Sequence, residues 1–171
     1  MKAADKTLND LFTEILKDTY SAEKQVLRAL GKMSKAAESE KLAVALDAHR
    51  AETEGQIDRL QQIFEMLGKP ARGKTCEAIN GILEEANEIA QEFKGSEVLD
   101  AGIIAAQQAV EHYEITRYGT LKSWAAELGL EEAVPLLAQT LEEERKTDEI
   151  LTKLAEERVN QDAAEAGAEG E

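Results

Sequence analysis

The stretch QQAVEHYEITRY, residues 107–118, lies near the middle of a long apolar run and decides the predicted fold. Between residues 98 and 128 the apolar positions fall on more than one stripe of a 3.6-residue helix, so we expect a helix covered on most sides. Within this run, Glu111 and Glu114 stand three residues apart where core residues are expected. Because a lone ionised carboxylate is costly to remove from water, each needs a cation, a proton or a metal ion.

The composition predicts an all-helical protein in a reducing compartment. The chain has 171 residues with only two prolines and 4% aromatic residues, which suits one helical domain. Its single cysteine, Cys76, excludes an internal disulfide framework and a cysteine-based zinc site. We find no signal-peptide pattern and no apolar run of membrane-spanning length, so we expect a soluble cytoplasmic protein. A formal net charge of −15 argues against nucleic acid and membrane as partners.

Turn signals divide the chain into helices and a tail. Long helices are expected from Thr7 to the break at 38–40, over 41–67, over 97–128 and from about 131, with a shorter helix over 76–93. Gly68 and Gly129 end the second and third of the long helices. We therefore predict one helical domain over residues 1–159. Residues 160–171 carry no large apolar side chain and are predicted to be a disordered acidic tail.

Each long helix has polar or acidic residues on its predicted buried face at mid-length. Glu23 and Gln56 are 33 residues apart, and so are Glu111 and Glu144, so two helix pairs would bring these positions to one level. The candidate metal-binding residues on these faces are Glu23, His49, Gln56, Glu111, Glu114, Glu144 and Asp148. Di-iron and di-manganese carboxylate bundles are built from inward-facing residues of this kind.

Four further stretches stand out: DTYSAEKQ (18–25), HRAETEGQIDRL (49–60), EHYEITRYGTL (111–121) and LEEERKTDEIL (141–151). They resemble the YciF-like family of bacterial stress proteins, which belongs to the ferritin-like, rubrerythrin-related superfamily. The resemblance implies a ferritin-like up-down four-helix bundle, with a shorter crossover helix between the second and third long helices. It also implies a homodimer and a di-metal centre, with a role in general, osmotic or oxidative stress.

The resemblance also implies which residues would hold the metals. Glu23 matches the glutamate of the first rubrerythrin helix, and Glu111 and Glu114 match the Glu-x-x-Glu of the third. Glu144 matches the glutamate of the fourth helix, and Asp148 stands four residues later, where a histidine is usual.

The second long helix departs most from the family pattern, because its usual Glu-x-x-His is missing. Gln56 stands at the level of the expected glutamate, and His49 and Glu52 are candidate substitutes one to two turns earlier.

An oxygen-rich set of ligands with at most one imidazole suits two divalent iron or manganese ions better than zinc or copper. The expected chemistry is oxidation of Fe(II) or breakdown of peroxide. Hydrogen bonds to the ligating oxygens are expected from Tyr20, Tyr113 and Tyr118.

An alternative interpretation needs no metal. Arg59, three residues after Gln56, and Arg117, three residues after Glu114, are close enough in sequence to neutralise carboxylates in a buried salt-bridge layer. The protein would then be a metal-free helical dimer with a structural or partner-binding role. In either case, the apolar surplus over residues 97–128 favours a dimer face.

Overall fold

The computed structural model describes residues 6–168, and every regular element within that range is a helix. The elements are α1 (Leu8–Ala36), α2 (Glu40–Met66), α3 (Glu77–Glu92), α4 (Leu99–Glu127), α5 (Ala133–Leu154), the π-helical turn η1 (Ala155–Val159) and α6 (Asn160–Ala168). The predicted helices are all present, with ends shifted by about two residues, as is usual for helix termini. Among the described helices, none has both the length and the apolar character needed to cross a bilayer.

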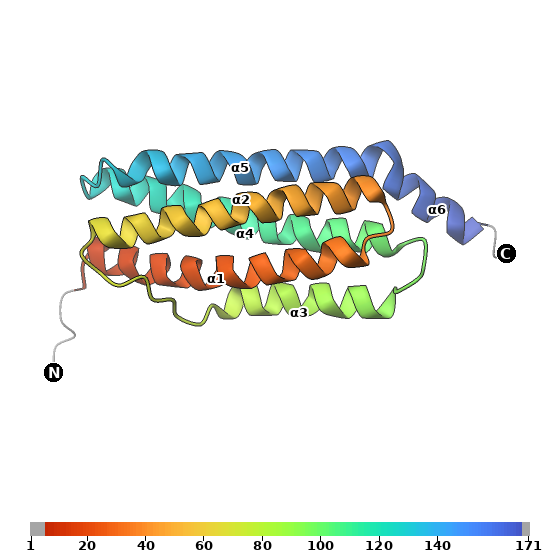
Figure 1. Cartoon of the computed structure of the whole chain (residues 1–171), viewed down its shortest axis with the longest axis horizontal. Coiled ribbons are helices and arrows are strands. Elements are labelled where there is room, and N and C mark those ends of the chain that lie inside the picture. The colour runs from red at the N-terminus through yellow and green to blue at the C-terminus, as the bar shows by residue number, and fades with distance from the viewer. Residues whose placement is uncertain (1–5, 169–171) are drawn as a thin grey trace.

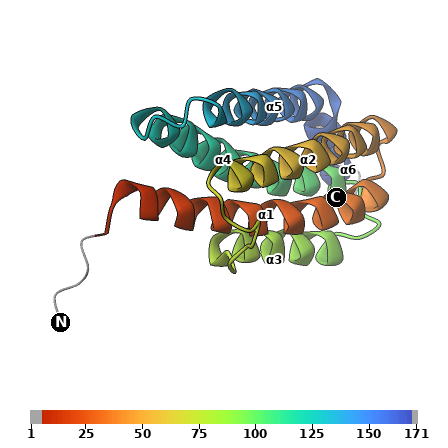
Figure 2. The same cartoon turned by 60° about the vertical axis from the view of Figure 1, so that its left-hand side comes forward.

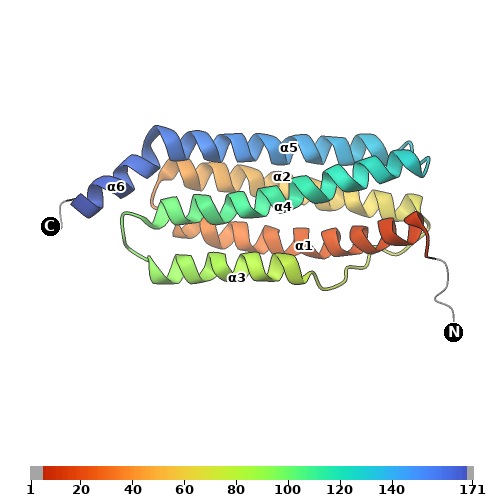
Figure 3. The same cartoon turned by 180° about the vertical axis from the view of Figure 1, so that it is seen from behind.

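The four long helices form the predicted up-down bundle with a crossover. α1 runs antiparallel to α2, and α4 runs antiparallel to α5 (Figure 1). The connection from α2 to α4 carries α3 along the outside of the bundle, where it packs against α4 and α1 (Figure 3). Figure 2 shows that α3 runs beside only the C-terminal part of α1.

The helix ends follow from local side chains. Thr7 caps α1 in a capping box, because its hydroxyl accepts from the Asp10 N–H while the Asp10 carboxylate accepts from the Thr7 N–H. Gly68 and Gly129 have φ values of 62° and 69°, which other residues rarely adopt, and they end α2 and α4 as predicted.

Residues 160–168 differ from the predicted disordered tail, because they form α6. This helix continues α5 through η1, so it extends an existing helix and does not need to form an unfavourable first turn of its own. Its alanine-rich sequence has high helix propensity, and Arg158 Nε lies 2.8 Å from Asp162 Oδ2 one turn later. The absence of large apolar side chains therefore did not indicate disorder here. The rest of the predicted tail, residues 169–171, lies outside the described residues.

The apolar surplus of α4 is covered within one chain rather than left for a dimer face. α4 packs against α5, α3 and α1, and its Ile103 and Ile104 are each 2% exposed. At Gly102 an added Cβ would lie 2.6 Å from Ile89 Cγ2, so this glycine allows α3 to approach α4 closely. The crossover helix thus accounts for the second apolar stripe.

The interior consists of two apolar clusters with polar residues between them. One cluster includes Val26, Leu30, Leu46, Val110 and Leu151, and the other includes Phe12, Leu16, Leu60, Leu121 and Leu137. Buried polar side chains from all four long helices separate these clusters at mid-length. This polar layer is where the candidate site lies.

Candidate metal site

Five acidic or basic side chains from the four long helices meet in the polar layer, and we call them the buried cluster. They are Glu23 of α1, His49 of α2, Glu111 and Glu114 of α4, and Glu144 of α5, each at most 1% exposed. His49, Glu111, Glu114 and Glu144 each offer one ligand atom, and these four atoms lie within 4.8 Å of one another. Such spacing is compatible with a shared cation.

His49 is the only basic residue of the buried cluster. Its Nε2 atom lies 3.2 Å from Glu111 Oε1 and 3.5 Å from Glu144 Oε2. Its Nδ1 atom lies 3.1 Å from Thr147 Oγ1 and 3.5 Å from Glu52 Oε2. Burial alone would lower the pKa of His49, but the carboxylates around it, Glu111 foremost, raise that pKa to about 10. In the absence of metal, this imidazole is therefore the cation of the cluster.

The buried carboxyl groups are held in an environment that disfavours their charge. Burial raises the pKa of Glu23 to about 7. Burial, together with the neighbouring carboxylates, also raises the pKa values of Glu114 and Glu144 well above the ordinary range. One imidazolium cannot neutralise all these groups, so the metal-free cluster must retain protons.

Two neighbouring side chains fix part of the cluster. The Tyr118 hydroxyl donates to Glu23 Oε1, and the Gln107 amide donates to Glu111 Oε1. The second oxygen of each of these glutamates, and both oxygens of Glu114 and Glu144, are buried without a hydrogen-bond partner. Buried polar atoms without partners are uncommon and costly, so their convergence at one place requires an explanation.

Gln56 is buried in the same layer, on α2. Its Nε2 atom donates to Glu143 Oε2 at 3.2 Å, and its Oε1 atom is buried without a partner. Gln61, five residues later on α2, donates to the Tyr20 hydroxyl on antiparallel α1. This contact places Gln56 within about one helical turn of the level of Glu23.

Glu52 and Asp148 lie outside the buried cluster, although the sequence placed both among the candidate ligands. Asp148 contacts His112 of α4, with 3.3 Å between Oδ2 and His112 Nε2, and its side chain is 23% exposed. Glu52 is 37% exposed and reaches only the outer nitrogen of His49. A residue three or four positions from an inward-facing ligand is rotated by about 40–60° around the helix, which is enough to bring it to the boundary between two neighbouring helices.

The arginine-based salt-bridge layer of the alternative interpretation is not found among the described residues. Arg59 pairs with Glu143, and its Nε donates to Thr140 Oγ1 at 3.0 Å. Arg117 lies 3.7 Å from Asp18. Both guanidinium groups lie toward the surface of the bundle and contact carboxylates other than those of the buried cluster. That part of the prediction was wrong.

The sequence also missed supporting residues. Gln107 and Thr147 touch the cluster, and each lies one turn from a ligand candidate on the same helix face, which is the signal that could have identified them. Of the three predicted tyrosines, Tyr118 reaches a cluster glutamate, whereas Tyr20 contacts Gln61 and Tyr113 contacts Cys76.

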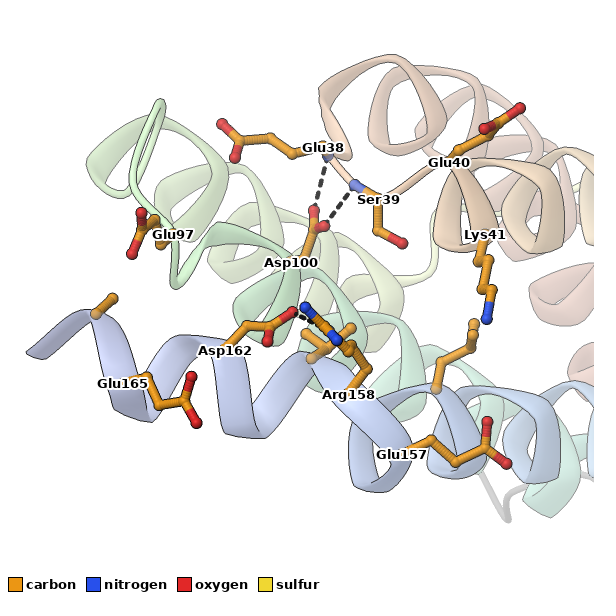
Figure 4. Close-up of a pocket in the computed structure, with 13 residues that line it drawn as sticks. Glu38, Ser39, Glu40, Lys41, Glu97, Asp100, Glu157, Arg158, Asp162 and Glu165 are labelled. Atoms are coloured by element: carbon orange, nitrogen blue, oxygen red, sulfur yellow. Dashed lines mark hydrogen bonds and ion pairs between the residues drawn. The ribbon is translucent and has the colours of Figure 1, made fainter.

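A surface hollow of about 880 Å³ lies apart from the cluster, at the end of the bundle where α6 leaves it (Figure 4). Most of its charged lining residues are acidic. Asp100 accepts from the backbone N–H groups of Glu38 and Ser39 at 2.9 and 2.7 Å, so it ties α4 to the start of α2. None of the lining residues belongs to the buried cluster, so this hollow does not open into the candidate site.

Comparison with known proteins identifies relatives that span nearly the whole chain. A family model described as a domain of unknown function, DUF892, matches residues 7–164. Protein YciF of Escherichia coli strain K12 is 49% identical over 159 residues, which cover 92% of this chain and 96% of that protein.

Solved structures agree with this result. The crystal structure of the E. coli stress protein YciF has a TM-score of 0.86 and 49% identity, covering 91% of this chain and 98% of that one. YcfI from Rhodopseudomonas palustris has a TM-score of 0.85 and 44% identity, covering 89% of this chain and 97% of that one. A protein from Xanthomonas campestris, at 21% identity and a TM-score of 0.68, covers 90% of this chain and 94% of that one and shares the fold. The match to YciF confirms the ferritin-like bundle that the resemblance implied.

Proposed function

The chain belongs to the DUF892 family of YciF-like stress proteins, and we propose that it binds two divalent iron or manganese ions in the buried cluster. The observation that carries this proposal is a set of six buried carboxylate oxygens without hydrogen-bond partners, contributed by Glu23, Glu111, Glu114 and Glu144 beside the imidazole of His49. Glu114 and Glu144 each contribute both oxygens, as bridging carboxylates do.

The donor set supports the choice of metals. Four carboxylates balance the four positive charges of two divalent ions, and His49 adds one imidazole nitrogen. Oxygen-rich sites of this kind favour iron, manganese or magnesium over zinc and copper. Of these, iron and manganese provide redox chemistry.

The activity we propose for this centre is oxidation of Fe(II) or breakdown of peroxide. The bound ions would supply the electron chemistry. Tyr118 and Gln107 hold one oxygen each of Glu23 and Glu111, so the other oxygen of each glutamate is free to bind metal. All cluster side chains are at most 1% exposed, so only an ion or a very small molecule fits the site as a substrate.

Metal analysis of two variants tests this proposal. We expect wild-type protein, loaded anaerobically with Fe(II) or Mn(II) and desalted, to retain about two ions per chain. Glu144→Gln should lose most of this metal, because it removes a carboxylate that faces the others. Asp148→Asn makes the same change of charge one turn away at the surface and should retain it. A wild type that stays metal-free, or an Asp148→Asn variant that loses its metal, would contradict the proposal.

We also propose that the protein is a homodimer that uses the N-terminal half of α1. Leu8 and Leu11 are 37% and 48% exposed and share a helix face with half-buried Ile15, on a part of α1 that α3 does not cover (Figure 2). Leu11→Glu should convert a dimer to a monomer in light scattering. Val44→Glu, at a 62% exposed position of α2, should leave the dimer intact. Equal effects of the two variants, or a monomeric wild type, would exclude this face.

A further inference from the structure

Glu143 lies outside the buried cluster and is held by side chains of α2 and of its own helix, α5. Its Oε2 atom accepts from Gln56 Nε2 and pairs with Arg59, and its Oε1 atom accepts from Gln139 Nε2 at 3.1 Å. Arg59 is in turn fixed by its bond to Thr140. A carboxylate with this many donors on a 20% exposed side chain has little freedom to reorient.

This arrangement determines which way the Gln56 amide faces. A carboxylate paired with an arginine accepts hydrogen bonds and donates none, so the group that Gln56 turns toward Glu143 must be its NH2. The amide oxygen then points away from Glu143, and it is buried without a hydrogen-bond partner on a side chain that is fully buried in the polar layer. If the amide were reversed, it would present N–H donors to the space where the cations are proposed to bind.

We propose that Arg59 and Glu143 are positioning residues that aim the Gln56 oxygen into the centre as a neutral metal ligand. This inference rests on the proposed function, because the ligand is useful only if ions occupy the cluster. The neutral oxygen adds a donor without adding charge, so four carboxylates still balance two divalent ions. A glutamate at this position would leave the centre with one excess negative charge.

The first test compares two adjacent glutamates on α5 by competition titration with Mn²⁺. Glu143→Gln should lower the Mn²⁺ affinity roughly 10–100-fold, as loss of a residue that orients a ligand typically does. Glu142→Gln removes the same charge from an exposed neighbour and should stay within about twofold of wild type. Melting of the metal-free variants shows whether both remain folded.

The second test separates positioning from a merely structural role. In a Gln56→Leu background, Glu143→Gln should cause no further loss of Mn²⁺ affinity, because it acts only through Gln56. The double change Gln56→Glu with Glu143→Gln exchanges the hydrogen-bond donor and acceptor between the two positions. The amide at position 143 then donates to one oxygen of the carboxylate at position 56, and the other oxygen of that carboxylate faces inward. This exchange restores an inward oxygen ligand, so the double variant should bind Mn²⁺ more tightly than Glu143→Gln alone.

The outcomes distinguish this inference from the proposed function. A wild type that binds Mn²⁺ while Glu143→Gln keeps full affinity overturns the positioning role alone. The positioning role is also overturned if Glu143→Gln lowers the Mn²⁺ affinity of the Gln56→Leu variant as much as it lowers that of the wild type. It is likewise overturned if Glu142→Gln causes the same loss of Mn²⁺ affinity as Glu143→Gln. A wild type that binds no Mn²⁺ overturns both proposals.

Discussion

Replacing Glu114 with glutamine is expected to raise the melting temperature of the metal-free protein while it weakens metal binding. Both Glu114 oxygens are buried without a partner, and burial raises the pKa of this group well above its ordinary range. At neutral pH, the folded metal-free protein must therefore either protonate this carboxyl group or bury its charge. Glutamine has nearly the same shape and needs neither, and its amide can donate to the unpartnered oxygen of Glu23.

The expected gain is up to about 3 kcal/mol at neutral pH, because keeping a proton on a carboxyl group whose ordinary pKa is 4.5 costs about 1.4 kcal/mol for each pH unit above that value. At about 2–4 °C per kcal/mol for a chain of this length, the melting temperature should rise by several degrees. Calorimetry after removal of metal measures this gain. Addition of Mn²⁺ should reverse the order, because wild type is stabilised by its ligand and the variant much less.

Glu127→Gln provides the control, because Glu127 is exposed on the same helix. Glu127→Gln should leave the melting temperature within about 1 °C of the wild-type value both without metal and with Mn²⁺, as most surface substitutions do. If Glu114→Gln instead lowered the metal-free melting temperature, the carboxylate would have a stabilising partner without metal, and the main argument for a metal centre would be lost.

The parts of this structure that depend on helical periodicity could be predicted from the sequence. Two glutamates inside an apolar run pointed to the polar layer, and glycines after apolar stripes located the ends of α2 and α4. Periodicity places a residue on a face to within about 50°, because neighbouring positions differ by 100° around the helix. That margin is enough to identify the face of Glu23 or Glu144.

The same uncertainty of about 50° around the helix explains why some residues expected near the cluster lie outside it. Asp148 and Arg59 each lie three or four positions from an inward residue, and both turn into a seam between helices, where a partner from the next helix decides their contacts. The partners, His112 and Glu143, depend on how the helices pack side by side, which the one-dimensional pattern does not contain. For the same reason, the orientation of Gln56 followed only from the structure.

A second expected result is that the metal-free protein loses stability as the pH rises from about 5 to 8. The pKa of Glu23 is raised from 4.5 to about 7 in the folded protein, so between these values the folded chain keeps a proton that the unfolded chain has released. Stability must therefore fall through this window. The raised pKa values of Glu114 and Glu144 act in the same direction.

His49 extends the decline to higher pH. Its pKa is raised from 6.5 to about 10, so its contribution to stability is complete below pH 6.5 and is lost as the pH approaches 10. Asp10 and Glu14 have lowered pKa values, and their contributions are lost only as the pH falls below their ordinary values of 3.8 and 4.5. They therefore do not reverse the trend between pH 5 and 8.

Melting temperatures from pH 5 to 8.5 at constant ionic strength measure this dependence. Each group that takes part contributes a slope of up to about 1.4 kcal/mol per pH unit. With saturating Mn²⁺ the trend should flatten or reverse, because metal binds the deprotonated ligands and competes better as protons become scarce. Glu114→Gln should flatten the metal-free curve as well. A metal-free wild type that becomes more stable between pH 5 and 8 would mean that the buried carboxylates are charged and paired, which would remove the need for a metal.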